Sequence, residues 1–315
     1  MGLNINKAPQ QVKESKVLRA PSSKIRVIKP EKGVYRPVVN ICLMGIPGTG
    51  KTRAIAQAIE LGAKVVMINT DTGQSGEETI LSYLRTAGKE DLFYSNLIII
   101  RVDDDDELSD FLAKPEKSFP EIYEFDPDIL VWEGFSNWQQ TKLYSKVGEL
   151  YRETVEIANE NSSKEKSVST QRAEGLQLEM QDWGKIRNAS IQRLEEFLNL
   201  NNKVTGREWV HLVTIHEAVE TKMLKQENAP PVAMEQLSGR PLIQGAAKNL
   251  IGGGFTLSLR CREERGKYYY ELSTTKTMGM SKNRGIALPE KFDADFVKVI
   301  DAIESSYNIT LFKRG

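Results

Sequence analysis

The chain has 315 residues, enough for one large domain or two small ones, and its 40% of apolar residues is enough for a substantial core. Lysine and arginine (43) balance aspartate and glutamate (43), so the net charge points to no class of partner. No apolar run approaches the roughly 18 residues of a membrane span, and the N-terminus lacks the apolar stretch of a signal peptide. The only cysteines, Cys42 and Cys261, lie far apart in apolar runs. We therefore expect no membrane span, disulfide framework or zinc site, and a cytoplasmic location.

Residues 1–37 form a basic segment with few large apolar side chains. Its nine basic residues, against Glu14 and Glu31, are Lys7, Lys13, Lys16, Arg19, Lys24, Arg26, Lys29, Lys32 and Arg36. This composition predicts an extended or flexible arm and leaves residues 38–315 as the core. Contact with nucleic acid or a neighbouring subunit, and a solvated tail without a role, both fit the pattern.

Strands and helices alternate after this arm. Apolar runs predict strands at 38–44, 65–69, 97–102, 129–132, 209–215, 254–261 and 268–274, the last two as a hairpin around 264–267. Helical spacing predicts helices at 52–61, 77–86, 186–200 and 292–307, and the polar stretch 139–181 is helix-prone. This alternation predicts an α/β fold, with a mainly parallel central sheet and helices on both faces. A ligand would lie at the carboxyl ends of the strands.

The acidic run 103–107 follows a predicted strand. We interpret it as an exposed turn into a helix, because acidic side chains are favoured near a helix N-terminus. A metal site is the alternative.

Residues 45–52 match the phosphate-loop pattern G-x-x-x-x-G-K-[ST] without a mismatch. The motif lies between a predicted strand and a predicted helix, so backbone N–H groups and the helix N-terminus would face phosphate oxygens. We expect Lys51 to reach the β- and γ-phosphates of ATP and the Thr52 hydroxyl to bind Mg²⁺. The residues expected to hold the nucleotide are Gly45, Ile46, Pro47, Gly48, Thr49, Gly50, Lys51 and Thr52.

Two acidic residues are candidates for the rest of a nucleotide site. Glu133 ends the apolar run 129–132, where a carboxylate would complete the Mg²⁺ shell. Asp71 follows the strand 65–69 and is our candidate for the base that activates water. The alternatives are a strand-end acid that faces solvent for Glu133, and an Asx turn leading into Gly73 for Asp71.

Three further residues have candidate roles around a γ-phosphate. His216 ends the strand 209–215, where its side chain would sense the phosphate and signal to the following segment; a strand-end histidine without a role is the alternative. Lys282 and Arg284 lie on a glycine-containing loop and would neutralise charge on the phosphate of a neighbouring subunit. Contact with DNA phosphates, or a solvated loop, also fits this pair.

The order of these motifs resembles that of RecA-core ATPases, and more narrowly that of phage-encoded, core-only RecA-like proteins that anneal single strands. The matching stretches are GIPGTGKT (45–52), MINTD (67–71), DILVWEGFS (128–136), QDWG (181–184), VTIHE (213–217), PLIQGAAKNLI (241–251) and SKNRG (281–285). The phosphate loop is specific only to the large class. The resemblance spans about residues 38–290.

The resemblance implies a RecA-like P-loop fold and an ATPase that assembles into a ring or filament, binds single-stranded DNA and promotes strand annealing or exchange. Lys51 and Thr52 carry over directly. Asp71 stands where these proteins place a glutamate and Glu133 where they place an aspartate. Lys282 and Arg284 match a pair that acts in trans, and the host cytoplasm is the implied location. Implied DNA contacts are Trp138 and the stretch 221–240, with Lys222, Lys225 and Arg240.

Two other classes of function remain open. The exchanged acids fit an ATP-binding assembly switch that hydrolyses little and acts through a protein partner. A small-molecule kinase would use the same loop, but no arginine-rich lid is evident, since Arg260, Arg262 and Arg265 lie in a strand-like run.

Overall fold

The computed structural model describes residues 18–19, 26–27, 37–71, 75–146, 180–202, 207–226, 229–243, 251–272 and 283–314. The chain divides into two compact units, Met1–Pro37 and Val38–Gly315. In the first unit, β1 (Leu18–Arg19) pairs antiparallel with β2 (Arg26–Val27). Most of this unit lies outside the described residues, so the flexible arm stays a prediction.

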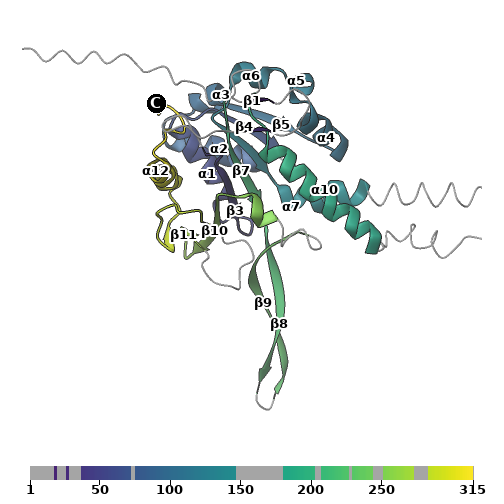
Figure 1. Ribbon diagram of the computed structural model, residues 1–315. Coiled ribbons are helices and arrows are strands. Elements are labelled where there is room, and N and C mark those ends of the chain that lie inside the picture. The colour runs from purple at the N-terminus through teal and green to yellow at the C-terminus, as the bar shows by residue number, and fades with distance from the viewer. Residues whose placement is uncertain are drawn as a thin grey trace, which may run out of the picture. The chain divides into compact units, whose positions relative to one another are not determined.

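The second unit contains an eight-stranded sheet with the order β12-β11-β10-β3-β7-β6-β4-β5 (Figure 1). Its six parallel strands are β10 (Leu257–Glu264), β3 (Asn40–Met44), β7 (Val210–Ile215), β6 (Ile129–Glu133), β4 (Val65–Asn69) and β5 (Leu97–Arg101). At one edge, β11 (Lys267–Glu271) pairs antiparallel with β10, and β12 (Lys291–Asp293) pairs antiparallel with β11. The predicted mainly parallel α/β sheet is confirmed.

Helices cover both faces of this sheet, as predicted. They are α1 (Lys51–Glu60), α2 (Ser75–Thr86), α3 (Asp91–Asn96), α4 (Asp105–Ala113), α5 (Pro115–Ser118), α6 (Glu121–Phe125), α7 (Phe135–Asn137), the π-helix η1 (Trp138–Leu143), α10 (Met180–Leu198), the 3₁₀ helix η2 (Ile251–Gly254) and α12 (Phe296–Tyr307). Residues 147–179, in the middle of the stretch predicted to be helix-prone, lie outside the described residues.

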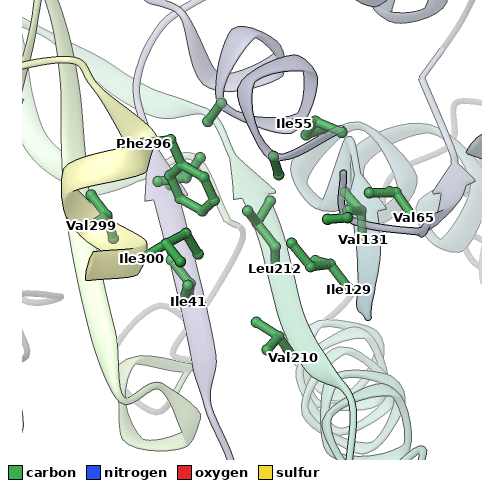
Figure 2. Packing of buried hydrophobic residues seen from close by; sticks show 14 of the residues in the cluster. Ile41, Ile55, Val65, Ile129, Val131, Val210, Leu212, Phe296, Val299 and Ile300 are labelled. Atoms are coloured by element: carbon green, nitrogen blue, oxygen red, sulfur yellow. The ribbon is translucent and has the colours of Figure 1, made fainter. Parts of the chain in front are cut away.

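Alternating side chains of the strands feed two separate cores. On β3, Ile41 and Leu43 belong to the core shared with α1, α2 and α12, whereas Cys42 and Met44 belong to the core shared with α4 and α10. Figure 2 shows the first core, where Phe296 and other residues of α12 lie against β3 and β7. The inner strands are covered on both faces, so apolar side chains point to both sides of the sheet. This explains why their sequences are continuous apolar runs.

Several local predictions have a clear outcome. The hairpin of β10 and β11 turns at Arg265 and Gly266, both with positive φ, as expected near 264–267. The last helix begins at Phe296 instead of residue 292, because 291–293 pair with β11 and Asp295 caps the helix by accepting from the N–H of Val297. The stretch 221–240 lies in a two-stranded antiparallel hairpin, β8 (Glu217–Gln226) with β9 (Ala229–Pro241).

The acidic run 103–107 forms the turn into α4. The Asp104 side chain accepts a hydrogen bond from the N–H of Glu107 and so caps the helix. The Asp105 side chain is buried, and its Oδ2 lies 3.2 Å from Nζ of Lys146. Cys42 and Cys261 are buried free thiols. Within the described ranges, no helix is long and apolar enough to cross a bilayer.

His211 lies at the centre of the sheet on β7. It is fully buried, and its Nδ1 lies 3.1 Å from Oδ1 of Asn40. Burial lowers the pKa of this imidazole from 6.5 to about 4, because the interior disfavours the charged form.

This pKa predicts a pH dependence of stability. As the pH falls from 6.5 to 4, the unfolded chain binds a proton at position 211 that the folded chain rejects, so the free energy of unfolding falls. The loss amounts to about 3 kcal/mol at pH 4 and levels off below that pH. Urea unfolding between pH 7 and 4 should show a smaller loss for His211→Gln than for the wild type. Parallel pH profiles for the two proteins would contradict this assignment.

Candidate functional site

The phosphate-loop motif forms a tight turn between β3 and α1. Gly48 (φ 80°) and Gly50 (φ 89°) adopt left-handed conformations that favour glycine. Gly45 has no room for a side chain, since a Cβ there would lie 2.4 Å from Oγ1 of Thr49 and 2.7 Å from the carbonyl oxygen of Cys261. The glycines of the motif are therefore required by backbone shape and by close packing.

Lys51 is buried and held by the loop itself. Its Nζ donates to the carbonyl oxygens of Gly45 and Ile46, each at 2.9 Å. Burial lowers the pKa of Lys51, and the nearby Glu133 partly offsets this effect. Both acceptors are neutral carbonyls, so an anionic phosphate would be a stronger partner for this ammonium group.

Glu133 meets the motif from the end of β6. The Thr52 hydroxyl donates to its Oε1 at 2.9 Å. Its other oxygen, Oε2, is buried and has no hydrogen-bond partner of normal geometry among the residues that the structure describes, although the Thr214 hydroxyl group is close enough to lower the pKa of this carboxyl group. Burial raises the pKa of this carboxyl group, and the charge of Asp71 raises it further. The alternative of a strand-end acid that faces solvent is wrong, because the side chain is buried.

These residues fit Mg²⁺ bound together with a nucleotide. A buried carboxylate oxygen without a partner, beside a hydroxyl group, offers the hard oxygen ligands that Mg²⁺ prefers. No group of three or more His, Cys, Asp or Glu side chains is arranged around a metal position within the described residues. Mg²⁺ needs no such group, because in nucleotide sites it takes one or two protein ligands and completes its shell with phosphates and water.

Asp71 lies next to Glu133 at the end of β4. A Cβ on Gly134 would lie 2.3 Å from Oδ1 of Asp71, so this carboxylate rests directly on the backbone that follows Glu133. The Asp71 N–H donates to Oδ1 of Asn69 at 3.0 Å, so the Asx-type bond at this turn comes from Asn69. Asp71 is left to line the cavity described below. Gly73 lies outside the described residues.

His216 reaches the same site from the end of β7. The order of the sheet explains this, because β7 lies between β3, which carries the loop, and β6, which carries Glu133. The His216 N–H donates to Oγ of Ser136 at 3.0 Å. Burial lowers the pKa of its imidazole, and the positive charge of Lys51 lowers it further, so the ring is neutral at pH 7.

A cavity of about 1260 Å³ connects these residues. Its wall includes Lys51, Thr52, Asp71, Glu133 and His216 and continues along α2. The volume is comparable with that of large small-molecule sites.

Part of this wall is aromatic and was not predicted from the sequence. The Arg53 guanidinium lies 5.4 Å from the ring centroid of Tyr83 on α2 and 5.6 Å from that of Tyr268 on β11. The Arg53 Nε is buried and has no hydrogen-bond partner within the described ranges. Position 53 follows the motif directly, which was a usable signal. Nothing in the local sequence places either tyrosine at this loop, since that depends on the order of the sheet.

Arg284, one residue of the predicted cationic pair, does not line this cavity within one chain. The Arg284 N–H donates to the carbonyl oxygen of Thr256, just before β10 begins, and its side chain donates to Gly253. Because β10 is parallel to β3, the start of β10 lies at the end of the sheet away from the phosphate loop, which follows the end of β3. Action in trans stays a prediction, and Lys282 lies outside the described residues.

The implied DNA contacts have mixed outcomes. Trp138 is fully buried against Trp132 and Phe135, with ring centroids 5.2 and 5.3 Å away, so its prediction as a DNA contact is wrong. Arg240 is exposed at the end of the hairpin, 3.9 Å from Glu220. The side chains of Lys222 and Lys225 lie outside the described part of the structure.

Comparison with known proteins adds no relative to this geometry. A scan against models of protein families gave no match to the chain, and a search of curated proteins gave none either.

Gly134 provides a test of the packing between Asp71 and Glu133. Gly134→Ala places a Cβ on the Asp71 carboxylate and forces a left-handed φ of 85° on alanine, so the free energy of unfolding should fall by about 2 kcal/mol. Gly184→Ala, on α10 with no atom within 4 Å of its Cβ, is the matched control and should raise it by up to about 1 kcal/mol. Urea unfolding measures both. Similar effects of the two substitutions would contradict the close packing.

Proposed function

We propose that this chain is a RecA-like, Mg²⁺-dependent ATPase that binds single-stranded DNA and promotes strand annealing or exchange as an oligomer. The observation that carries the nucleotide part is the contact between Thr52 and Glu133, with Lys51 beside it and a buried oxygen of Glu133 left over. The DNA and assembly parts rest on the resemblance of motifs such as VTIHE and SKNRG to RecA-core ATPases.

Each residue of the site has a role in this proposal. Lys51 would exchange its carbonyl partners for the β- and γ-phosphates, and the N–H groups of the loop would bind the remaining phosphate oxygens. Thr52 and Glu133 would hold Mg²⁺, which supplies positive charge against the phosphate oxygens. Asp71 would accept a proton from the attacking water. The neutral His216 would donate a hydrogen bond toward the terminal phosphate.

A second candidate, an ATP-binding assembly switch, is favoured by one observation. Asp71 stands where RecA-core ATPases place a glutamate and Glu133 where they place an aspartate, and Oε1 of Glu133 already accepts a hydrogen bond from the Thr52 hydroxyl group. An exchange of the two acids would make turnover slow. Such a protein would use nucleotide occupancy to control assembly or a protein partner.

ATP hydrolysis measured with and without a single-stranded oligonucleotide, with light scattering in the same samples, tests the proposal. The recombinase predicts that DNA raises the rate severalfold and that scattering increases through assembly. Glu133→Gln keeps the shape of the side chain and should lower kcat at least 100-fold (about 3 kcal/mol) while ATP still binds. A rate and scattering unchanged by DNA would overturn the recombinase, and negligible hydrolysis with tight ATP binding would favour the switch.

Arg284 tests hydrolysis between subunits. Arg284 lies at the end of its own sheet away from the phosphate loop. Arg284→Ala should therefore leave the dissociation constant of ATP for the protomer within about twofold of the wild-type value. The same substitution should lower the rate of the assembled protein at least tenfold (about 1.4 kcal/mol), through lost stabilisation of phosphate charge. Equal losses of binding and rate would refute action in trans. Arg262→Ala, which removes a half-buried cation of β10, is the control.

A further inference from the structure

The hairpin of β8 and β9 leaves the sheet at the phosphate site. Only His216 separates the end of β7 from Glu217, the first residue of β8. On the return side, Pro241 at the end of β9 pairs with Glu217, and the N–H of Leu242 donates to the carbonyl oxygen of His216 at 2.6 Å. Both strands of the hairpin are thus fastened to the residue that lines the cavity. We call Glu217 together with Pro241 and Leu242 the hairpin root.

One carbonyl group is shared by the hairpin root and the phosphate loop. The carbonyl oxygen of Gly45 accepts from Nζ of Lys51 at 2.9 Å and from the N–H of Glu217 at 3.2 Å. On its other side, the Gly45 N–H donates to the carbonyl oxygen of Ile215 at 3.1 Å. The first residue of the loop is therefore bonded to the chain both before and after His216.

A buried ion pair fixes the side chain of Glu217. Arg260 on β10 donates from Nε to Oε2 of Glu217 at 3.0 Å, and its Nη2 donates to Oε1, so the contact is bidentate. The Glu217 side chain is fully buried, and 10% of the Arg260 side chain is exposed. Since β10 and β7 flank β3 on opposite sides, this pair joins the two neighbours of the loop-bearing strand.

We propose that the hairpin root senses occupancy of the phosphate site, and that Arg260 is the positioning residue that couples the two. The proposal rests on the proposed nucleotide site. When Lys51 turns toward a phosphate it leaves the Gly45 oxygen, and the N–H of Glu217 becomes the remaining donor to that oxygen among the contacts described above. That bond strengthens because it is no longer shared. Arg260 transmits the change, because it prevents Glu217 from shifting independently of the sheet.

Hydrogen–deuterium exchange of the full chain measures this coupling. A non-hydrolysable ATP analogue with Mg²⁺ should slow exchange at the backbone amides of 217–220 and 240–242 at least threefold in the wild type. The dissociation constant of the analogue is measured in parallel by calorimetry.

A neutral variant separates coupling from binding and from folding. Glu217→Gln combined with Arg260→Leu removes the ion pair without leaving Glu217 as a buried charge, which Arg260→Leu alone would do. Glu271, which lies 3.7 Å from Arg260, keeps Lys291 at 3.9 Å. It should bind the analogue within threefold of the wild type and lose the exchange response at the hairpin root. The matched control is Asp128→Asn with Arg207→Gln, near the start of β6 and so at the end of the sheet away from the phosphate loop, and it should keep the response. It removes the pair of Arg207 with Asp128, and Asp126, the second partner of Arg207, keeps its hydrogen bonds from Asn202 and Trp209.

The outcomes distinguish the two levels of the argument. Failure of the wild type to bind the analogue would overturn the proposed nucleotide site, and the coupling with it. Binding without slower exchange at the root, or a response that persists in the Glu217→Gln/Arg260→Leu variant, would overturn the coupling alone. Loss of the response in the Asp128→Asn/Arg207→Gln control as well would assign it to general destabilisation and also overturn the role of Arg260.

Discussion

The buried carboxyl group of Glu133 is the constraint on which the candidate site depends. Removing a carboxylate from water is costly unless it is paired, and here one oxygen has a hydroxyl partner while the other has none within the described residues. Asp71 adds a second negative charge nearby, and the positive charge of Lys51 partly compensates by lowering the pKa of Glu133. Such an arrangement is incomplete by itself and favours a divalent cation. The fold therefore holds two carboxyl groups and one ammonium group close together where the parallel strands end.

The parallel sheet supplies the geometry for this constraint. Strands that run in one direction bring their last residues to one edge, and Asp71, Glu133 and His216 follow three such strands beside the phosphate loop. The helices on both faces hold these strands through two apolar cores, so the polar groups can be placed without weakening the interior. Rigid packing around a small polar edge is what allows a few side chains to be positioned closely.

Much of the site could be predicted from the sequence because its signals are local. The loop motif needs glycines at fixed spacing, and an acid after an apolar run marks the end of a strand, as Glu133 shows. The rest depended on sheet order and burial, which no local pattern encodes. Arg284 lies at the end of the sheet away from the phosphate loop because β10 runs parallel to β3. Trp138 is buried because it packs against Trp132 of β6. Tyr268 meets Arg53 because β10 pairs with β3, which brings the β10–β11 hairpin to the loop, whereas Tyr83 meets it because α2 packs against α1.

The position of β3 in the sheet also has a consequence for how the protein folds. Its two neighbours come from far along the chain, since Asn40 contacts His211, 171 residues later, and Thr256, 216 residues later. Contacts between such distant segments form slowly, because the entropy cost of closing the long intervening loop precedes the stabilising contacts. During synthesis the phosphate motif emerges early, yet the strands that hold it in place arrive only after most of the chain has been made. The N-terminal half alone would therefore contain the phosphate-loop sequence but lack β7 and β10, the two strands that flank β3 in the sheet.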